Sequence, residues 1–529
     1  MRYIGVRWIA IISILVMAIF ACSYAENEKE QLSTAPDANA TINPTSTIQL
    51  ALTPKISFDP FLNRKMIFGL TQLRLGDPQD INLSKELGVS WISSQPFVIW
   101  VDIEKVPGYY DWSKLDEEVS TIQQMNLDCV IVLIPMTLAP EEQAKIKKET
   151  GAADYRFLLF KNDSGDVQLY PHTEAENNRW KNFIRALVDR YNGDGVNDAP
   201  HLRFPVRNWQ ILDQFPSPWF SDVKTYLNLL RISYQGIKSI DPTARVLLAG
   251  VASENVQRLA FANGDIEDNE AGVVAGTRFG RPQVGSMKDT KIAKLNLEFI
   301  LKEGKGSFDI ADLHLYVPKT TFVHGEITWL RNLLLQYGYN IPVWITEAGG
   351  PYKLRAGQKS SFGDYYYGYY TDKENAEFVI KIHVLAAVDE VERFNWRLAE
   401  TEGKDFYNGP YSNMGLIHPN SMKKPSYFAY KNLRNFLQDF SNVIDLSSKN
   451  VKLYEFSIGS QKKYIGWLEK ETKQNTIDLS KYLPRGILKI VPVITALDSR
   501  GNALQPDNIN VEIYAVPMGI TPIFIEGQE

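Results

Sequence analysis

The sequence predicts an α/β fold, a (β/α)8 TIM barrel followed by a small all-β sandwich domain. From Lys65 onward, short apolar runs alternate with amphipathic stretches in a rhythm typical of strand-helix units and a parallel sheet. Past Phe440 this rhythm stops, and short strand-like runs separated by turns take over. A doubly wound open sheet is the alternative for the first part, but no glycine-rich phosphate turn follows any strand.

Eight strand-like runs alternate with helical runs in the segment assigned to the barrel, residues 58–440. The predicted strands are Met66–Thr71, Val89–Ser93, Asp128–Pro135, Val206–Asp213, Arg245–Val251, Ile310–Val317, Pro342–Thr346 and Arg393–Ala399. The predicted helices are Leu115–Met125, Glu174–Tyr191, Val223–Ile240, Ile292–Lys302, Gly325–Tyr337, Lys373–Val388 and Ser426–Leu437. Eight strands, seven of them followed by a predicted helix, favour a closed parallel barrel, whose ligand site lies where the strands end.

Two connections that follow strands are too long to be simple turns. Met136–His172 contains a polar helical stretch and a hairpin signal, and Ala252–Thr290 is rich in Gly, Asn and Asp. Loops of this size in a compact domain are usually functional lids or loose insertions. We expect them to form the walls of a cleft above the barrel.

The C-terminal segment, residues 441–529, reads as a small antiparallel sandwich packed on the barrel. Its predicted strands are Val451–Phe456, Lys463–Leu468, Thr476–Leu479, Leu488–Thr495, Asn510–Val516 and Thr521–Ile525. A support for the barrel and a sugar-binding module are both compatible with this pattern. The support is favoured because the segment gathers no cluster of aromatic residues.

Residues 1–22 read as a lipoprotein signal peptide. Arg2 and Arg7 precede an apolar run that is short for a membrane span, and the run ends at Cys22, which resembles the lipidated cysteine of a bacterial lipobox. A plain signal peptide ending near Ala25 is the alternative. Residues 23–57 have the composition of a disordered tether. The predicted protein is exported and held at the bacterial cell envelope through its lipid, or is secreted.

The charge and the cysteine content of the chain argue against several kinds of partner and cofactor. The formal net charge is −5 and no basic stripe is present, which argues against nucleic acid as a partner. The chain has two cysteines, so no disulfide framework is expected. It has no Cys/His cluster at zinc spacing and no phosphate loop, so no cofactor is expected to be required.

The most informative stretch is Pro342–Gly350, an apolar strand that stops on a carboxylate with two glycines behind it. A buried strand that ends in Glu347 holds its acid at a rigid tip, where a parallel barrel places its chemistry. The pattern indicates a catalytic nucleophile.

Several motifs in chain order resemble the clan A glycoside hydrolases, which are TIM barrels of the retaining type. They are Trp100 with Pro107–Trp112, His314 with Tyr316, Thr346–Gly349, Trp396, Asn413–Ile417 and Lys424–Tyr427. Each motif alone is weak, and together they span most of the barrel. The resemblance implies a carbohydrate substrate and makes Glu347 the nucleophile.

The chain departs from that clan at the end of the fourth strand. There the clan has Asn-Glu, the Glu being the general acid and base, whereas this chain has Asp213-Gln214. Gln214 has no proton to give, and a retaining glycosidase relies on two carboxyl groups roughly 5–5.5 Å apart. Asp213 is the nearest substitute, but successive strand side chains point to opposite faces.

Six residues are predicted to contact the sugar, each with a plain packing alternative. His314 and Tyr316 lie two apart on one strand and so point the same way into the barrel mouth. The other four are aromatic and suit the apolar face of a sugar ring; they are Trp100, Trp219, Trp396 and Tyr366.

The loop Asn192–Asp198 is rich in oxygen ligands and glycine, as calcium loops are. Asn192, Asp194 and Asp198 would be the ligands of a structural Ca²⁺. The closing bidentate Glu of such loops is missing, and an ordinary turn before the fourth strand is the alternative.

Three functional hypotheses follow. The first is an exported glycosidase or transglycosidase in which Glu347 attacks. Its protonation is supplied by Asp213, is supplied by a carboxylate on a long loop, or is not needed. The second is a carbohydrate-binding surface lipoprotein that has lost turnover. The third is an adhesion protein in which the barrel is a platform, and the intact set of Glu347, His314, Tyr316 and Trp396 argues against it.

Overall fold

The computed structural model describes most of the chain beyond its N-terminal segment. The described residues are 66–136, 171, 173–215, 223–266, 277–278, 281–282, 284–351, 354–355, 369–400, 414–438, 440–472, 476–483 and 486–527. The predicted signal peptide with Cys22, the tether, Trp219, Tyr366 and most of Met136–His172 lie outside them. In the described part, no helix is long and apolar enough to cross a membrane.

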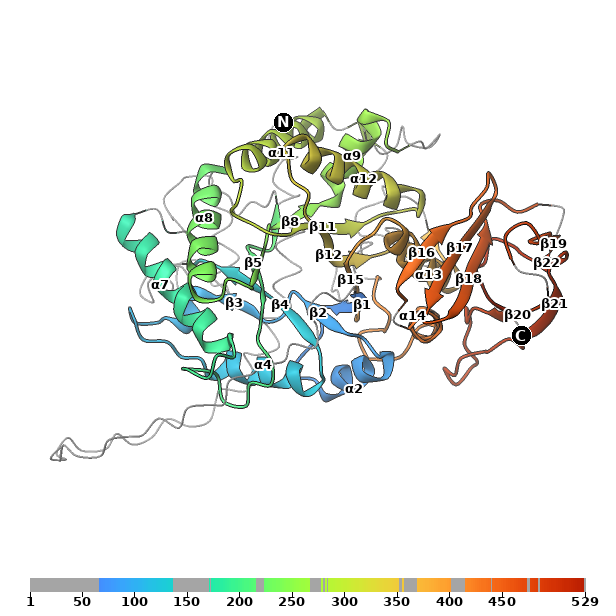
Figure 1. Cartoon of the computed structure of the whole chain (residues 1–529), viewed down its shortest axis with the longest axis horizontal. Helices are drawn as coiled ribbons and strands as arrows, with labels where there is room; N and C mark the ends of the chain where they lie inside the picture. Colours follow the sequence, from blue (N-terminus) through green and yellow to red (C-terminus); the bar gives the residue numbers. More distant parts are fainter. Residues whose placement is uncertain are drawn as a thin grey trace, which may run out of the picture.

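The first and larger part is a TIM-barrel-like α/β fold around one curled parallel sheet (Figure 1). The strand order is β6-β8-β11-β12-β15-β1-β2-β4-β5-β7, with β3 paired to β4. Their bounds are β1 Met66–Thr71, β2 Trp91–Ser93, β3 Phe97–Ile99, β4 Asp128–Ile134, β5 Asn208–Ile211, β6 Gln214–Phe215, β7 Arg245–Leu247, β8 Gly250–Ala252, β11 Ala311–Tyr316, β12 Val343–Gly349 and β15 Arg393–Arg397. The predicted parallel α/β architecture is therefore confirmed.

Two predicted strands are each divided in two. Val206–Asp213 becomes β5 and β6, and Arg245–Val251 becomes β7 and β8. β5 pairs with β7, and β6 pairs with β8, so the two breaks lie side by side in the sheet. At the first break Leu212 has a φ of 64°, which changes the direction of the side chains that follow β5.

Helices surround the sheet and cover its outer face (Figure 1). They are α2 Pro78–Leu87, α3 Trp100–Ile103, α4 Ser113–Gln124, α7 Glu174–Tyr191, α8 Val223–Ile240, α9 Ser253–Asn263, α11 Val284–Glu303, α12 Thr321–Gln336, α13 Asp372–Val388 and α14 Pro425–Leu437. The sequence prediction missed α2, although Asp77 caps its start, Pro78 opens it and Gly88 ends it in a left-handed conformation. It also assigned α9 to a loop.

The C-terminal part is all-β, as predicted, and begins with β16 at Asn442. Its main sheet is antiparallel with the order β16-β17-β18-β23-β20-β21, and β19 pairs separately with β22. The bounds are β16 Asn442–Asp445, β17 Val451–Ile458, β18 Gln461–Leu468, β19 Thr476–Ile477, β20 Ile487–Pro492, β21 Ile509–Glu512, β22 Val516–Pro517 and β23 Ile523–Gly527. One large sheet with a two-stranded companion is not clearly the sandwich that the sequence suggested.

The two parts share a contact surface. Phe436 of α14 stacks on Phe524 of β23 with ring centroids 4.6 Å apart. Thr521 donates a hydrogen bond to Glu377 of α13 over 2.5 Å. The continuous packing fits the prediction that the C-terminal part supports the barrel.

Candidate active site

Glu347 lies at a bulge near the end of β12. β11 and β12 pair with Asp312 opposite Trp344 and with His314 opposite Glu347, so β12 carries one extra residue between the two pairs. A bulge of this kind lets two successive side chains turn to the same face. Thr346 donates to Asp312 Oδ2 over 2.6 Å, and Glu347 next to it faces His314.

Asp213 is directed by a second irregularity. Leu212, between β5 and β6, has a φ of 64°, a left-handed conformation that is uncommon for residues other than glycine. It interrupts the alternation of side chains that a regular strand would show. The sequence argument against Asp213 as the substitute acid assumed an unbroken pleat, and the pleat is broken at Leu212.

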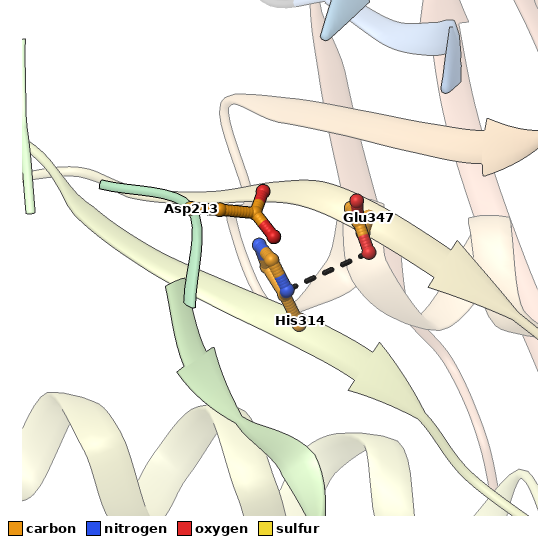
Figure 2. A group of neighbouring side chains, drawn as sticks. All are labelled: Asp213, His314 and Glu347. Atoms are coloured by element: carbon orange, nitrogen blue, oxygen red, sulfur yellow. Dashed lines mark ion pairs between the residues drawn. The ribbon is translucent and has the colours of Figure 1, made fainter. Parts of the chain in front are cut away.

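These irregularities bring Asp213, His314 and Glu347 together from β11, β12 and the β5–β6 junction (Figure 2). One oxygen of each carboxylate and one ring nitrogen of His314 all lie within 4.8 Å of one another. The group lies at the carboxyl ends of the strands, as the sequence predicted for the ligand site.

The carboxylate of Glu347 is held from several sides. The hydroxyl of Tyr316 donates to its Oε2 over 2.9 Å, and the hydroxyl of Ser94 donates to its Oε1 over 2.9 Å. His314 Nδ1 lies 3.5 Å from Oε2. The side chain is buried, so its orientation is fixed before any ligand arrives.

Asp312 contacts His314 at Nε2, the ring nitrogen that does not face Glu347. Its Nε2 lies 3.3 Å from Asp312 Oδ2, and both side chains are fully buried. Gln210 also donates to Asp312 over 2.9 Å. Gly250 makes room for this arrangement, because a Cβ there would lie 2.2 Å from His314 Nε2.

Burial and charge set the protonation of the group. Burial, and then the charge of Glu347, raise the pKa of Asp213 from 3.8 to about 7. Burial alone would lower the pKa of His314, but the charges of Glu347, Asp312 and Asp213 outweigh it and raise that pKa to about 9. Burial and the charge of Glu347 raise the pKa of Tyr316, so its hydroxyl remains a donor.

The arrangement can therefore present a protonated carboxyl beside a carboxylate at neutral pH. Among the described residues, Asp213, His314 and Glu347 are also the cluster whose composition suits a metal ion. A metal ligand must give up its proton. His314, whose pKa its acidic neighbours raise to about 9, would have to lose a proton before it could bind one.

Gln214 starts β6 and pairs with Gly250 of β8. Its side chain is half-buried. Among the described residues, Ser94 and Tyr316 donate the hydrogen bonds to Glu347, and Gln214 donates none.

Trp100 and Trp396 both lie in packed surroundings. Trp100 is buried against Trp180 of α7, and its indole N–H donates to Glu104. Trp396 is buried against Phe378 and His383 of α13, on the outer side of the sheet. Both placements favour the packing alternative over contact with a sugar ring.

The loop at residues 192–198 satisfies its own carboxylates. Asp198 accepts hydrogen bonds from the backbone N–H groups of Gly193 and Gly195 over 3.0 and 2.8 Å. Asp194 accepts from Val196 over 2.8 Å. These contacts favour the turn, and the calcium assignment remains a prediction.

Sequence reasoning missed two groups of the site. Asp312 stands two residues before His314 and four before Tyr316, so the spacing of same-face strand positions could have identified it. Ser94 follows β2 with a φ of 56°, and nothing in its local sequence marks it as a partner of Glu347.

Comparison with solved structures finds proteins of similar fold, whereas the two other comparisons find no match. No family model matches the sequence, and no curated protein matches it. Among solved structures, a family 39 glycoside hydrolase from Bacteroides cellulosilyticus superimposes with a TM-score of 0.53 at 15% identity, covering 88% of this chain and 81% of its own.

Two further structures resemble this chain. A monomeric beta-xylosidase from Caulobacter crescentus has a TM-score of 0.50 and 15% identity, with 91% and 99% of the two chains covered. The GH39 enzyme from Xanthomonas axonopodis has a TM-score of 0.50 and 14% identity, with 90% and 96% covered. At these identities the similarity shows a shared fold alone.

Proposed function

We propose that this protein is a retaining glycosidase in which Glu347 is the nucleophile and Asp213 the proton donor. The observation that carries the proposal is the pair of carboxyl groups, Asp213 and Glu347, whose oxygens lie within 4.8 Å of each other at the strand ends. Retaining enzymes place their carboxyl groups about 5–5.5 Å apart, whereas inverting enzymes leave about 6.5–9.5 Å for a water. The spacing supports the retaining class.

The reaction has two displacements. A carboxylate oxygen of Glu347 attacks the anomeric carbon, the glycosidic C–O bond breaks, and the leaving oxygen takes its electron pair and the proton of Asp213. Asp213, now ionised, removes a proton from water. The resulting hydroxide attacks the same carbon and releases Glu347, which restores both groups.

The neighbours of the pair fit this sequence of steps. The His314 cation and the Tyr316 hydroxyl both lie at Oε2 of Glu347, and they hold the carboxylate while its charge is consumed and regenerated. The same negative charge, with burial, keeps the proton on Asp213 in the resting state. Each carboxyl group therefore has a different task, which its surroundings set.

We further propose a carbohydrate substrate of the oligosaccharide or polysaccharide class, which the fold and the motifs support. β-Xylosides are the first substrates to test, because a beta-xylosidase is among the structures of similar fold. Export with a lipid on Cys22 is proposed from the N-terminal sequence alone.

The alternative is a carbohydrate-binding lipoprotein without turnover. Gln214 favours it, since that position carries the proton donor in the clan that the sequence resembles. Activity on a panel of aryl glycosides separates the two. Turnover, with retained anomeric configuration by proton NMR, supports the enzyme. Binding of oligosaccharide without turnover of any aryl glycoside would refute it.

A further inference from the structure

Ser93 and Ser94, consecutive residues where β2 ends, both reach across the barrel to the end of β12. The hydroxyl of Ser93 donates to the backbone carbonyl of Thr346, the residue before Glu347. The hydroxyl of Ser94 donates to Glu347 Oε1 over 2.9 Å. One serine therefore holds the backbone next to the proposed nucleophile, and the other holds its side chain.

The backbone conformation of Ser94 allows both serines to contact the end of β12. Successive side chains of a regular strand point to opposite faces, so only one of the two serines would face inward. The φ of 56° at Ser94 breaks the alternation and turns its hydroxyl to the same side as that of Ser93. Few residues other than glycine adopt this conformation.

Ser93 is itself held from a third strand. Asn395 of β15 donates from Nδ2 to Ser93 Oγ, and both side chains are buried. Gly69 of β1 leaves the space for Asn395, because a Cβ there would lie 1.7 Å from Asn395 Oδ1. The end of β2 is therefore fixed by β1 and β15 before it contacts β12.

The two oxygens of Glu347 have different surroundings. Oε2 faces Tyr316 at 2.9 Å and His314 at 3.5 Å, whereas among the described residues Oε1 receives its hydrogen bond from Ser94. Oε2 is thus the more strongly held oxygen, and Oε1 keeps more of its electron density for attack. Ser94, a neutral donor, is therefore the group that positions Oε1 within the described part of the chain.

We infer that Ser93 and Ser94 form a serine clamp, in which Ser94 is a positioning residue that aims Glu347 Oε1 at the anomeric carbon. The inference rests on the proposed function, and it deepens that function by assigning the attacking oxygen. The clamp acts on the step in which Glu347 attacks. It does not depend on the proton donor, because Ser94 has no part in protonating the leaving group.

The test uses 2,4-dinitrophenyl 2-deoxy-2-fluoro glycosides of xylose, arabinose and glucose with the full folded protein. Glu347 attacks the anomeric carbon, and the bond to dinitrophenolate breaks with its electron pair, so no proton donor is needed. Mass spectrometry of the intact protein counts the covalent ester, and peptide mapping locates it. The rate at saturating probe is separated from the probe concentration that gives half this rate.

Two variants of the same serine separate the hydroxyl from the backbone. Ser94→Ala removes the hydroxyl and keeps the cost of a positive φ, whereas Ser94→Gly removes the hydroxyl and relieves that cost. Both are expected to lower the saturating rate of labelling about tenfold or more, as for the loss of a hydrogen bond to a charged group. The half-saturating concentration should change less than about twofold, because the clamp aims the nucleophile and leaves sugar binding alone.

Ser113→Ala is the matched control. Ser113 also donates to a carboxylate, Asp111 Oδ1, over 2.6 Å, but on the exposed start of α4. Its loss should leave the labelling rate unchanged. A Ser94→Gly protein that labels at the wild-type rate would overturn the inference, since the backbone conformation and not the hydroxyl would then matter.

A second measurement needs no substrate. The fall in unfolding temperature caused by Ser94→Ala is compared in the wild-type protein and in Glu347→Ala, where the hydroxyl has lost its partner. The clamp predicts a fall of about one to three degrees in the first and almost none in the second. Equal falls would overturn the clamp, whatever the activity.

The two measurements also keep the clamp distinct from the proposed function. Suppose that Ser94→Ala lowers the unfolding temperature more in the wild-type protein than in Glu347→Ala, and that no probe labels the wild-type protein. This result would support the contact between the serine clamp and Glu347 and would refute the glycosidase. Labelling in the wild type with equal falls would support the glycosidase and refute the clamp.

Discussion

A carboxylate oxygen of Asp213 and one of Glu347 lie within 4.8 Å of each other, although β8 and β11 separate β12 from the β5–β6 junction in the strand order. His314 lies against the same pair and is held by Asp312 below it. Two like groups this close cannot both be ionised without cost. One therefore keeps its proton near neutral pH, and Asp213 is that group because its pKa is raised to about 7.

Asp213→Asn should lower kcat/KM about 10²- to 10⁴-fold on alkyl glycosides, because a general acid contributes that much to the departure of a poor leaving group. The loss should be much smaller on 2,4-dinitrophenyl glycosides, which leave without a proton. Initial rates on both substrate classes check it.

Gln214→Glu is the companion variant. If Asp213 is the acid, a second carboxyl at position 214 should change the rate on alkyl glycosides less than about threefold. A gain of a hundredfold or more would instead assign proton donation to position 214, and would make the natural protein an impaired enzyme.

The pH profile should follow Asp213. The first step needs its protonated form, and the pKa of about 7 means that this form is lost as the pH rises through 7. We expect kcat/KM on alkyl glycosides to fall about tenfold per pH unit above that value. Profiles from pH 5 to 9 measure it. The same basic limb persisting in Asp213→Asn would be inconsistent with this assignment.

Gly250→Ala should displace His314. The added Cβ would lie 2.2 Å from the imidazole ring and 2.9 Å from Asp312 Oδ2, so the pair must separate or the strand must shift. Overpacking of this kind costs about 1–3 kcal/mol. We expect kcat/KM to fall tenfold or more, with a lower unfolding temperature.

Gly527→Ala is the control for that change, because a Cβ there has no atom within 4 Å among the described residues. It should alter neither quantity. Wild-type kinetics in Gly250→Ala would show that the His314–Asp312 pair is dispensable.

Trp396→Phe should lower stability and leave sugar affinity unchanged. The indole packs on Phe378 and His383 outside the sheet, so the smaller ring leaves a gap that costs about 1–3 kcal/mol. Thermal unfolding and KM are measured on the same preparation. A several-fold rise in KM at an unchanged unfolding temperature would restore Trp396 to the sugar site.

Asp198→Ala should lower stability by about 1 kcal/mol through loss of its two hydrogen bonds to backbone N–H groups. Removal of divalent cations with EDTA should leave the unfolding temperature of the wild-type protein unchanged. A rise of several degrees on adding Ca²⁺ to the wild type, absent from Asp198→Ala, would instead establish the calcium site that the sequence suggested.

Much of this protein follows from its sequence by itself. Apolar runs of strand length that alternate with amphipathic runs predict a parallel α/β sheet. Strands buried in such a sheet are apolar along their length, whereas the helices that cover it are apolar on one side. The same reasoning puts the Glu347 carboxylate near the end of a buried strand, although β12 continues to Gly349 and does not stop at the acid. His314 and Tyr316, two apart on one strand, face the same way as predicted, since their strand is regular there.

The side chains that face one another at the strand ends could not be identified without the three-dimensional structure. Side-chain direction alternates predictably only while the pleat is regular, and here it breaks at Ser94, at Leu212 and at the bulge before Glu347. Trp396 shows the converse, because its neighbour Asn395 faces the interior and leaves the indole outside. Such breaks depend on how neighbouring strands pair. Strand pairing joins segments that are far apart in the sequence, so no local stretch of residues predicts it.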